Sequence, residues 1–177
     1  EGKLTISSDA GFEIVEKYRE NPKESGIDGV IVEVVIESAV TAIPANAFES
    51  YQSIKKVTIA EGVTSIGDRA FAYCRRLERI NIPDSVCYLG AYAFYDCSRL
   101  LSIELPESIT DIGMETFSGC TRLTTVIFPK SITDIGHMAF AFCPLIEKVY
   151  YCGTESDWNN IKINQYEISE IISSRIR

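Results

Sequence analysis

Four of the six cysteines recur at intervals of 23 residues, at Cys74, Cys97, Cys120 and Cys143. Thiolates bind zinc and paired thiols form disulfides, so such a series could be a metal site or a ladder of disulfides. The spacing matches no zinc motif, and side chains at one position of a repeating structure point in the same direction. We therefore favour a column of small buried thiols, which suits the strong tendency of cysteine to be buried. Cys87 and Cys152 fall at other positions of the repeat, and we expect no bond between them.

Pairs of carboxylates recur with the same interval and could bind a hard cation such as calcium. Asp111 and Asp134 form one pair, and Asp84 and Glu107 form another. Calcium takes about six to eight oxygen ligands, and the sequence has no D-x-D-x-D-G loop, so a solvated face is expected. The only histidine, His137, cannot be paired by spacing with a serine or cysteine nucleophile. We therefore predict no enzyme activity, no metal and no cofactor.

Three arginines form a further series with this interval, at Arg76, Arg99 and Arg122. If they stack about 5 Å apart, as neighbouring strands do, their guanidinium groups could hold a carboxylate, sulfate or phosphate group. The alternative is that each is solvated or pairs with a neighbouring carboxylate such as Glu78. The sequence leaves both possibilities open.

The apolar residues follow the same interval and indicate the elements that position these side chains. Phenylalanine occupies one position in five successive units, at Phe48, Phe71, Phe94, Phe117 and Phe140. The unit reads L-x-x-I-x-I-P-x-S-[VI]-T-x-I-G-x-x-A-F-x-x-C-x-x, and its alternating apolar residues predict a short strand that the proline ends. The glycine predicts a turn, and A-F-x-x-C predicts a short helical or 3₁₀ return. One unit cannot bury its apolar side alone, so we expect stacked units that share a parallel sheet.

This unit resembles the BspA-type leucine-rich repeats, also called the Treponema pallidum type. The similarity covers residues 31–152. The ends are also similar, because residues 2–6 resemble the G-x-L-T-I strand that starts such domains and residues 150–158 resemble their Y-Y-x-G-T-x-x-x-W element. The resemblance implies an α/β solenoid, a right-handed leucine-rich-repeat coil that is mostly β, with a parallel β-sheet face and short helical or 3₁₀ returns. It also implies a secreted or surface-displayed bacterial protein with a role in adhesion.

We predict a single leucine-rich-repeat domain over residues 1–177. Residues 31–152 form six 23-residue coils, the last one partial, where a coil is one turn of the solenoid. Residues 1–30 and 153–177 form the N-terminal and C-terminal caps, which an open solenoid needs because its two ends expose apolar side chains and strand edges.

Three helices are expected in these caps. Residues 9–19 predict one helix with Asp9 as its N-cap. Ser156 is predicted to cap a second helix, which carries the packed Trp158, and residues 167–172 predict a third.

The strand positions between the core residues project from the sheet, where solenoids commonly bind their partners. The candidate binding residues at these positions are Arg79, Asn81, Glu104, Thr125, Ile127, Lys148 and Tyr150. Ile127 and Tyr150, beside Thr125 and Lys148, have the composition of an interface hot spot. The alternative is a solvated face with scattered apolar residues.

Charge and composition exclude several classes of partner. The net charge of −8 disfavours binding to nucleic acid through phosphate neutralisation. No apolar run approaches the roughly 20 residues that span a membrane, so no membrane insertion is expected. We predict a monomeric, non-enzymatic module that binds a protein or glycan through its sheet face; the alternative is a structural spacer that positions a neighbouring domain. The expected location, extracellular or at the cell surface, follows from the resemblance alone.

Overall fold

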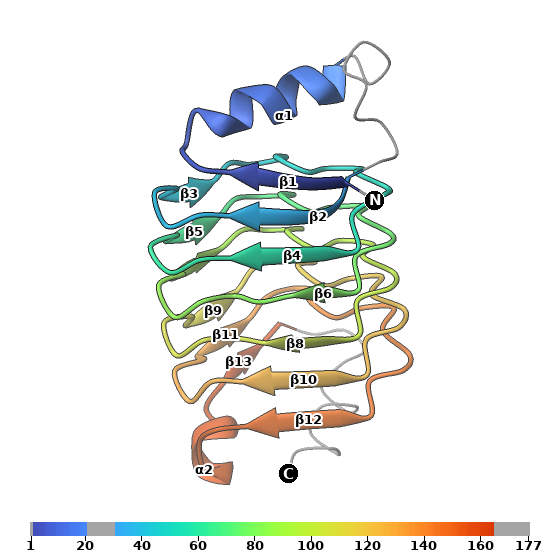
Figure 1. The fold of residues 1–177 in the computed structure, drawn as a ribbon. Coiled ribbons are helices and arrows are strands. Elements are labelled where there is room, and N and C mark those ends of the chain that lie inside the picture. The colour runs from blue at the N-terminus through green and yellow to red at the C-terminus, as the bar shows by residue number, and fades with distance from the viewer. Residues whose placement is uncertain (1, 21–30, 165–177) are drawn as a thin grey trace.

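The computed structural model describes residues 2–20 and 31–164 and shows a parallel β-solenoid, as predicted (Figure 1). One face carries a strand from every coil. Its strands are β1 (Gly2–Ile6), β2 (Ile31–Ile36), β4 (Lys56–Ile59), β6 (Arg79–Ile80), β8 (Ser102–Glu104), β10 (Thr125–Phe128) and β12 (Lys148–Tyr151). We call this the sheet face.

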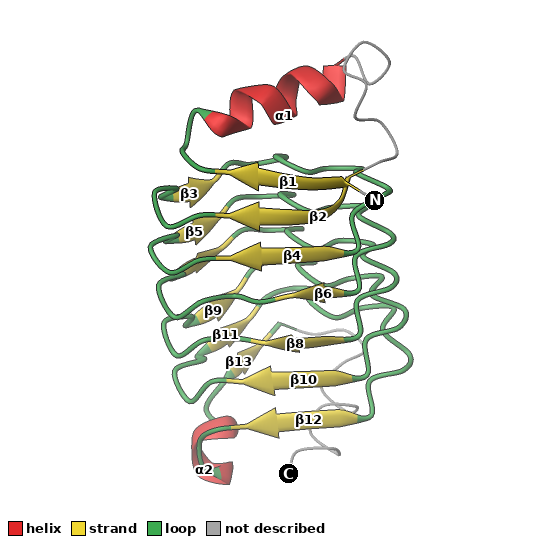
Figure 2. Ribbon diagram, in the orientation of Figure 1, coloured by secondary structure: helices red, strands yellow, loops and turns green. Residues whose placement is uncertain are grey.

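A second row of two-residue strands runs behind the sheet face (Figure 2). These strands are β3 (Ala42–Ile43), β5 (Ser65–Ile66), β7 (Tyr88–Leu89), β9 (Asp111–Ile112), β11 (Asp134–Ile135) and β13 (Lys162–Ile163). Turns connect the two rows, and the strand pairs between described residues are parallel.

The strand register explains the interval of 23 residues. Val34, Val57 and Ile80 are partners on successive strands, and Val126 pairs with Val149 in the same way. One repeat is therefore one coil, and equivalent positions stack in columns about 4.8 Å apart. A residue type that suits the core in one coil suits it in the next, which is why the apolar residues recur.

The phenylalanine column forms the centre of the core. Its five rings are buried, with neighbouring ring centroids 5.1 to 5.4 Å apart and neighbouring planes inclined by at most 14°. Phe12 contacts the ring of Phe48 edge-on at one end, and Phe128 contacts the ring of Phe140 at the other. Each inner ring therefore packs against a neighbour on both sides.

The cysteine column consists of buried free thiols. Each Sγ donates a hydrogen bond of 3.1 to 3.4 Å to the carbonyl oxygen of the phenylalanine 26 residues earlier. Burial raises the pKa of the Cys74 thiol to about 12 and holds the pKa values of Cys97 and Cys120 well above the ordinary value. Because the thiolate is the reactive form, these cysteines are structural groups that link adjacent coils.

The return segments differ from the short helices that the sequence predicts. They are successive turns in which alternate N–H groups bond to the next coil: Phe71 donates to the Ala93 carbonyl, whereas Ala70 bonds within its own coil. A helix would use all of these N–H groups internally, so the stacking of coils excludes it. This geometry places two residues of each return in the left-handed region, such as Arg69 (φ 55°) and Tyr73 (φ 60°).

The glycine column is explained by close approach of neighbouring coils. A Cβ atom on Gly90 would lie 2.4 Å from the backbone nitrogen of Asp68, and one on Gly67 would lie 2.5 Å from that of Ala45. Neither glycine has the left-handed backbone that favours this residue. The predicted turn is therefore a point where two backbones touch.

Both rows of strands are interrupted between the same two coils, since β6 does not pair with β8 and β7 does not pair with β9. On the opposite side of β6, toward β4, the Asn81 amide takes the place of strand backbone: Nδ2 donates to the Ile59 carbonyl at 2.7 Å and Oδ1 accepts from the Ile59 N–H at 2.9 Å. Pro83 occupies the same position in its coil as Ala60 in the preceding coil. The Ala60 N–H donates to the Ile36 carbonyl, whereas a proline has no N–H to donate. Because β6 and β8 are not paired, the sheet face consists of two sheets, while the returns of these coils remain hydrogen-bonded.

Helix α1 (Gly11–Glu20) lies beyond β1 at the N-terminal end of the solenoid (Figure 1). It confirms the helix expected at residues 9–19, and Phe12 and Val15 on one side of it are buried. The predicted N-cap is wrong, because the helix begins two residues after Asp9. The Asp9 carboxylate instead accepts hydrogen bonds from the N–H and hydroxyl of Thr41, at 2.9 and 2.8 Å, and these bonds lower its pKa.

Helix α2 (Glu155–Trp158) follows the last strand of the sheet face. Its N-cap is Thr154, which forms a capping box with Asp157, so the prediction of Ser156 is wrong by two residues. Trp158 is buried against Phe128 and Tyr151. The third helix, expected at residues 167–172, lies outside the described residues. Within the described ranges, no helix is both long and apolar enough to cross a membrane.

Candidate binding surface

Four of the candidate binding residues form one continuous surface on β10 and β12. Thr125 is the strand partner of Lys148, and Ile127 is the partner of Tyr150. Lys148 is exposed, Thr125 and Ile127 are half-buried, and 37% of the Tyr150 surface is exposed. The inward positions of these strands are buried, so the backbone that carries the four side chains is anchored in the core. We call these four residues the sheet-face patch.

The other three candidates have different surroundings. Glu104 lies on β8 as the partner of Ile127, next to the sheet-face patch, and is exposed. Arg79 is exposed on β6, across the interruption of the sheet. The amide of Asn81 is occupied by the backbone of Ile59, which makes this residue part of the scaffold.

The arginine column agrees with the alternative in which each side chain is solvated or pairs with a carboxylate, and binding of an anion stays a prediction. The Arg99 guanidinium lies 3.8 Å from the carboxylate of Glu78, as one alternative expected. Arg76 and Arg122 are exposed, and neither forms an ion pair with a residue that the structure describes. These two cations are open to an anion from outside the chain.

One of the four paired carboxylates, Glu107, is part of the scaffold. Of the pair Asp84 and Glu107, the Glu107 carboxylate accepts hydrogen bonds of 3.2 and 3.3 Å from two backbone N–H groups of the next coil. Asp111 and Asp134 are partners on β9 and β11. Across the described ranges, no three His, Cys, Asp or Glu side chains come together as they would around a metal ion. His137 is exposed.

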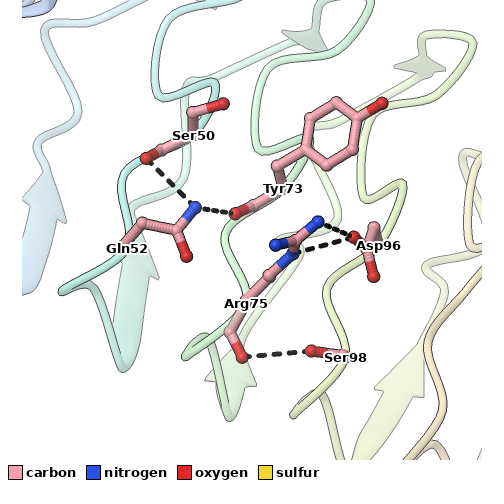
Figure 3. A network of polar contacts seen from close by, with 6 residues as sticks. All are labelled: Ser50, Gln52, Tyr73, Arg75, Asp96 and Ser98. Carbon is pink, nitrogen blue, oxygen red and sulfur yellow. Dashed lines mark hydrogen bonds and ion pairs between the residues drawn. The ribbon is translucent and has the colours of Figure 1, made fainter.

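The return side carries a polar network that the 23-residue columns do not predict (Figure 3). Arg75 forms an ion pair of 2.8 Å with Asp96, and its guanidinium lies 5.8 Å from the centroid of the Tyr73 ring. Ser98 donates to the Arg75 carbonyl, and Gln52 donates to the Tyr73 carbonyl. Arg75 and Asp96 are 21 residues apart, two short of one coil. Opposite charges at this diagonal spacing are the signal that could have revealed the pair.

Comparison with protein families agrees with this geometry. The model described as the BspA type leucine rich repeat region matches residues 31–172 in six copies. The chain belongs to the BspA-type leucine-rich repeat family. Comparison with curated proteins gives no match.

Solved leucine-rich repeat structures share the fold of this family member. A Treponema pallidum leucine-rich repeat protein is 33% identical, with a TM-score of 0.65 over 67% of this chain and 58% of its own. A Eubacterium ventriosum protein is 26% identical, with a TM-score of 0.65 over 89% of this chain and 39% of its own. The pneumococcal vaccine antigen PcpA is 25% identical, with a TM-score of 0.64 over 72% of this chain and 31% of its own. The chain thus spans less than two thirds of each of these proteins.

In this BspA-type repeat module, stacked strands hold the exposed side chains about 4.8 Å apart along the solenoid. The sheet-face patch offers an aromatic ring, an aliphatic side chain, a hydroxyl and an ammonium group on two adjacent strands. Such a surface can bury apolar area and form hydrogen bonds and ion pairs with a partner. The chemistry available there is that of recognition.

Proposed function

We propose that this chain is a non-enzymatic recognition module of a secreted or surface-displayed protein, and that it binds a protein partner through the sheet-face patch in adhesion. The pairing of Ile127 with Tyr150 on a buried scaffold is the observation that carries the proposal. The family resemblance and the description of PcpA as a vaccine antigen support the location.

The geometry suits binding with little loss of conformational freedom. The carbonyl and N–H groups of β10 are paired with neighbouring strands on both sides, so the backbone under Ile127 is already ordered. The Tyr150 side chain has few rotatable bonds and a hydroxyl at its tip. Ordering a flexible side chain costs about 0.5–1.5 kcal/mol on binding, and Ile127 and Tyr150 avoid most of that cost because their side chains have few rotatable bonds.

The described residues leave the sheet-face patch accessible. Helix α1 packs against Phe48 at the N-terminal end of the solenoid, far from β10 and β12 (Figure 1). A spacer would be favoured if α1 or the C-terminal tail covered the apolar residues of this face. Helix α1 does not cover them, and residues 165–177 of the tail lie outside the described residues.

The test is a binding screen of the purified chain against extracellular-matrix proteins and glycans, followed by titration of each partner found. Tyr150→Ala should weaken binding of a protein partner by roughly tenfold or more, the effect of losing a central aromatic residue. The matched control is Tyr88→Ala, because Tyr88 is an exposed tyrosine of the other row of strands, 53% exposed on β7. Equal affinities of the two variants would refute the sheet-face patch, and the absence of any partner in the screen would favour the spacer.

A further inference from the structure

Basic residues are concentrated where each return leads into a strand of the sheet face. We define the basic corner as residues 52–56, 75–79, 98–102 and 121–125, the same positions in four successive coils. It contains one of the chain's 25 acidic residues, Glu78, and seven of its 17 basic residues. The basic residues are Lys55, Lys56, Arg75, Arg76, Arg79, Arg99 and Arg122. A chain of net charge −8 thus carries a locally positive surface.

Hydrogen bonds between coils hold the basic corner in place. Ser98 donates its hydroxyl to the Arg75 carbonyl at 3.4 Å, and Thr121 donates its own to the Ser98 carbonyl at 3.2 Å. Beside them, the Thr124 N–H donates to Leu101 at 3.0 Å. The backbone positions that carry the cations of successive coils are therefore held about 4.8 Å apart in a line along the solenoid.

The positive charges of the basic corner are only partly neutralised. Three of the seven basic residues lie 2.8, 2.8 and 3.8 Å from a carboxylate, and these are Lys56, Arg75 and Arg99. Three others are exposed and form no ion pair with any described residue: Arg76, Arg79 and Arg122. Three guanidinium groups without a carboxylate partner among the described residues, in a chain rich in carboxylates, point to an anion from outside the chain.

We propose that the basic corner binds a linear sulfated glycan, whose sulfate groups are held by Arg76, Arg79 and Arg122. Guanidinium groups bind such oxyanions through paired N–H donors. The cations follow the solenoid axis, so a chain with repeated anionic groups can contact several of them at once. At physiological ionic strength the screening length is about 8 Å, so nearby cations act together while distant carboxylates are screened.

A sulfated glycan fits the basic corner better than a single-stranded nucleic acid does. Single strands are held largely by stacking of bases on aromatic side chains, and the four stretches of the basic corner contain no aromatic residue. The choice of a glycan found outside cells rests on the surface display proposed above. The three arginines that hold the glycan are not members of the sheet-face patch, which shares only Thr125 with the basic corner.

The proposal is tested by calorimetric titration of the purified chain with a heparin-derived oligosaccharide at physiological salt. Two probes are compared with it: the same oligosaccharide after desulfation, and single-stranded DNA with an equal number of charges. The sulfated probe should bind in a salt-dependent manner, and the other two should bind at least tenfold more weakly. Arg76→Gln combined with Arg122→Gln should weaken binding by about tenfold, because one exposed ion pair is worth roughly a two- to fivefold change in affinity.

The matched control is Lys130→Gln combined with Lys162→Gln, which removes the same charge from exposed positions outside the basic corner. This variant should bind within twofold of the unchanged protein. Equal losses of affinity in the two double variants would show an effect of net charge alone and would overturn the proposal. The proposal would also be overturned if the DNA bound as tightly as the sulfated probe, or if the sulfated probe did not bind. Tyr150→Ala should leave binding of the sulfated probe unchanged, so failure of the basic corner and failure of the sheet-face patch can be told apart.

Discussion

Replacement of Phe94 tests whether the phenylalanine column supports the whole solenoid. The Phe94 ring is fully buried between Phe71 and Phe117, with centroid distances of 5.4 and 5.3 Å and nearly parallel planes. Phe→Ala changes in protein cores typically cost about 3–5 kcal/mol. This range already includes the lost ring contacts, each worth about 0.5–1.5 kcal/mol beyond burial. Neighbouring coils cannot close the gap without breaking their strand register. We therefore expect Phe94→Ala to lower the free energy of unfolding by about 4 kcal/mol.

The measurement is urea unfolding followed by circular dichroism and by fluorescence of Trp158, the only tryptophan. Circular dichroism reports on all coils, while Trp158 reports on the C-terminal end, so the two signals also show whether the coils unfold together. Phe142→Ala is the control: it removes the same atoms from a side chain that is 64% exposed, and should change stability by no more than about 0.5 kcal/mol. A loss below about 1 kcal/mol for Phe94→Ala would refute the cavity estimate.

Three further predictions follow from the hydrogen bonds and thiols. Asn81→Ala should destabilise by about 1–2 kcal/mol in urea unfolding, since it leaves the N–H and carbonyl of Ile59 without partners; an unchanged midpoint would contradict the scaffold role. A thiol-labelling reagent at pH 8 should modify only the exposed Cys87 and Cys152 of the folded chain, as counted by mass spectrometry, and rapid labelling of more than two thiols would contradict burial of the column. Burial raises the pKa of Cys74 to about 12 from an ordinary value of about 8.5, so its stabilising effect is complete below about pH 8.5 and is lost as the pH rises toward 12. The urea midpoint should fall over this interval more steeply in the unchanged protein than in Cys74→Ala, and identical slopes would contradict the assignment.

Several features of the fold could be predicted because they depend on the repeat itself. The interval of 23 residues predicted the parallel solenoid, since one residue type at one position implies one environment in every coil. The first helix could be predicted for a different reason, because Phe12 and Val15 mark its apolar side.

Other features could not be predicted, because they depend on contacts between coils. The A-F-x-x-C segments have helical spacing, yet alternate N–H groups bond to the next coil and prevent a helix. Asn81 occupies an outward strand position, and only the absent N–H of Pro83 in the stacked structure explains why its amide bonds to Ile59. The ion pair between Arg75 and Asp96 could not be predicted from the columns because it joins residues of two different columns.

The amino-acid sequence alone was therefore enough for the family, the coil and the buried columns, because burial repeats with the chain. It was not enough for the sites. The tertiary structure decided that the sheet face is interrupted and that Asn81 belongs to the scaffold, while the sheet-face patch lies on continuous strands. It also showed which arginines of the basic corner have carboxylate partners. The physical reason is that a hydrogen bond or an ion pair depends on where a second coil places its atoms, and a one-dimensional repeat does not specify that position.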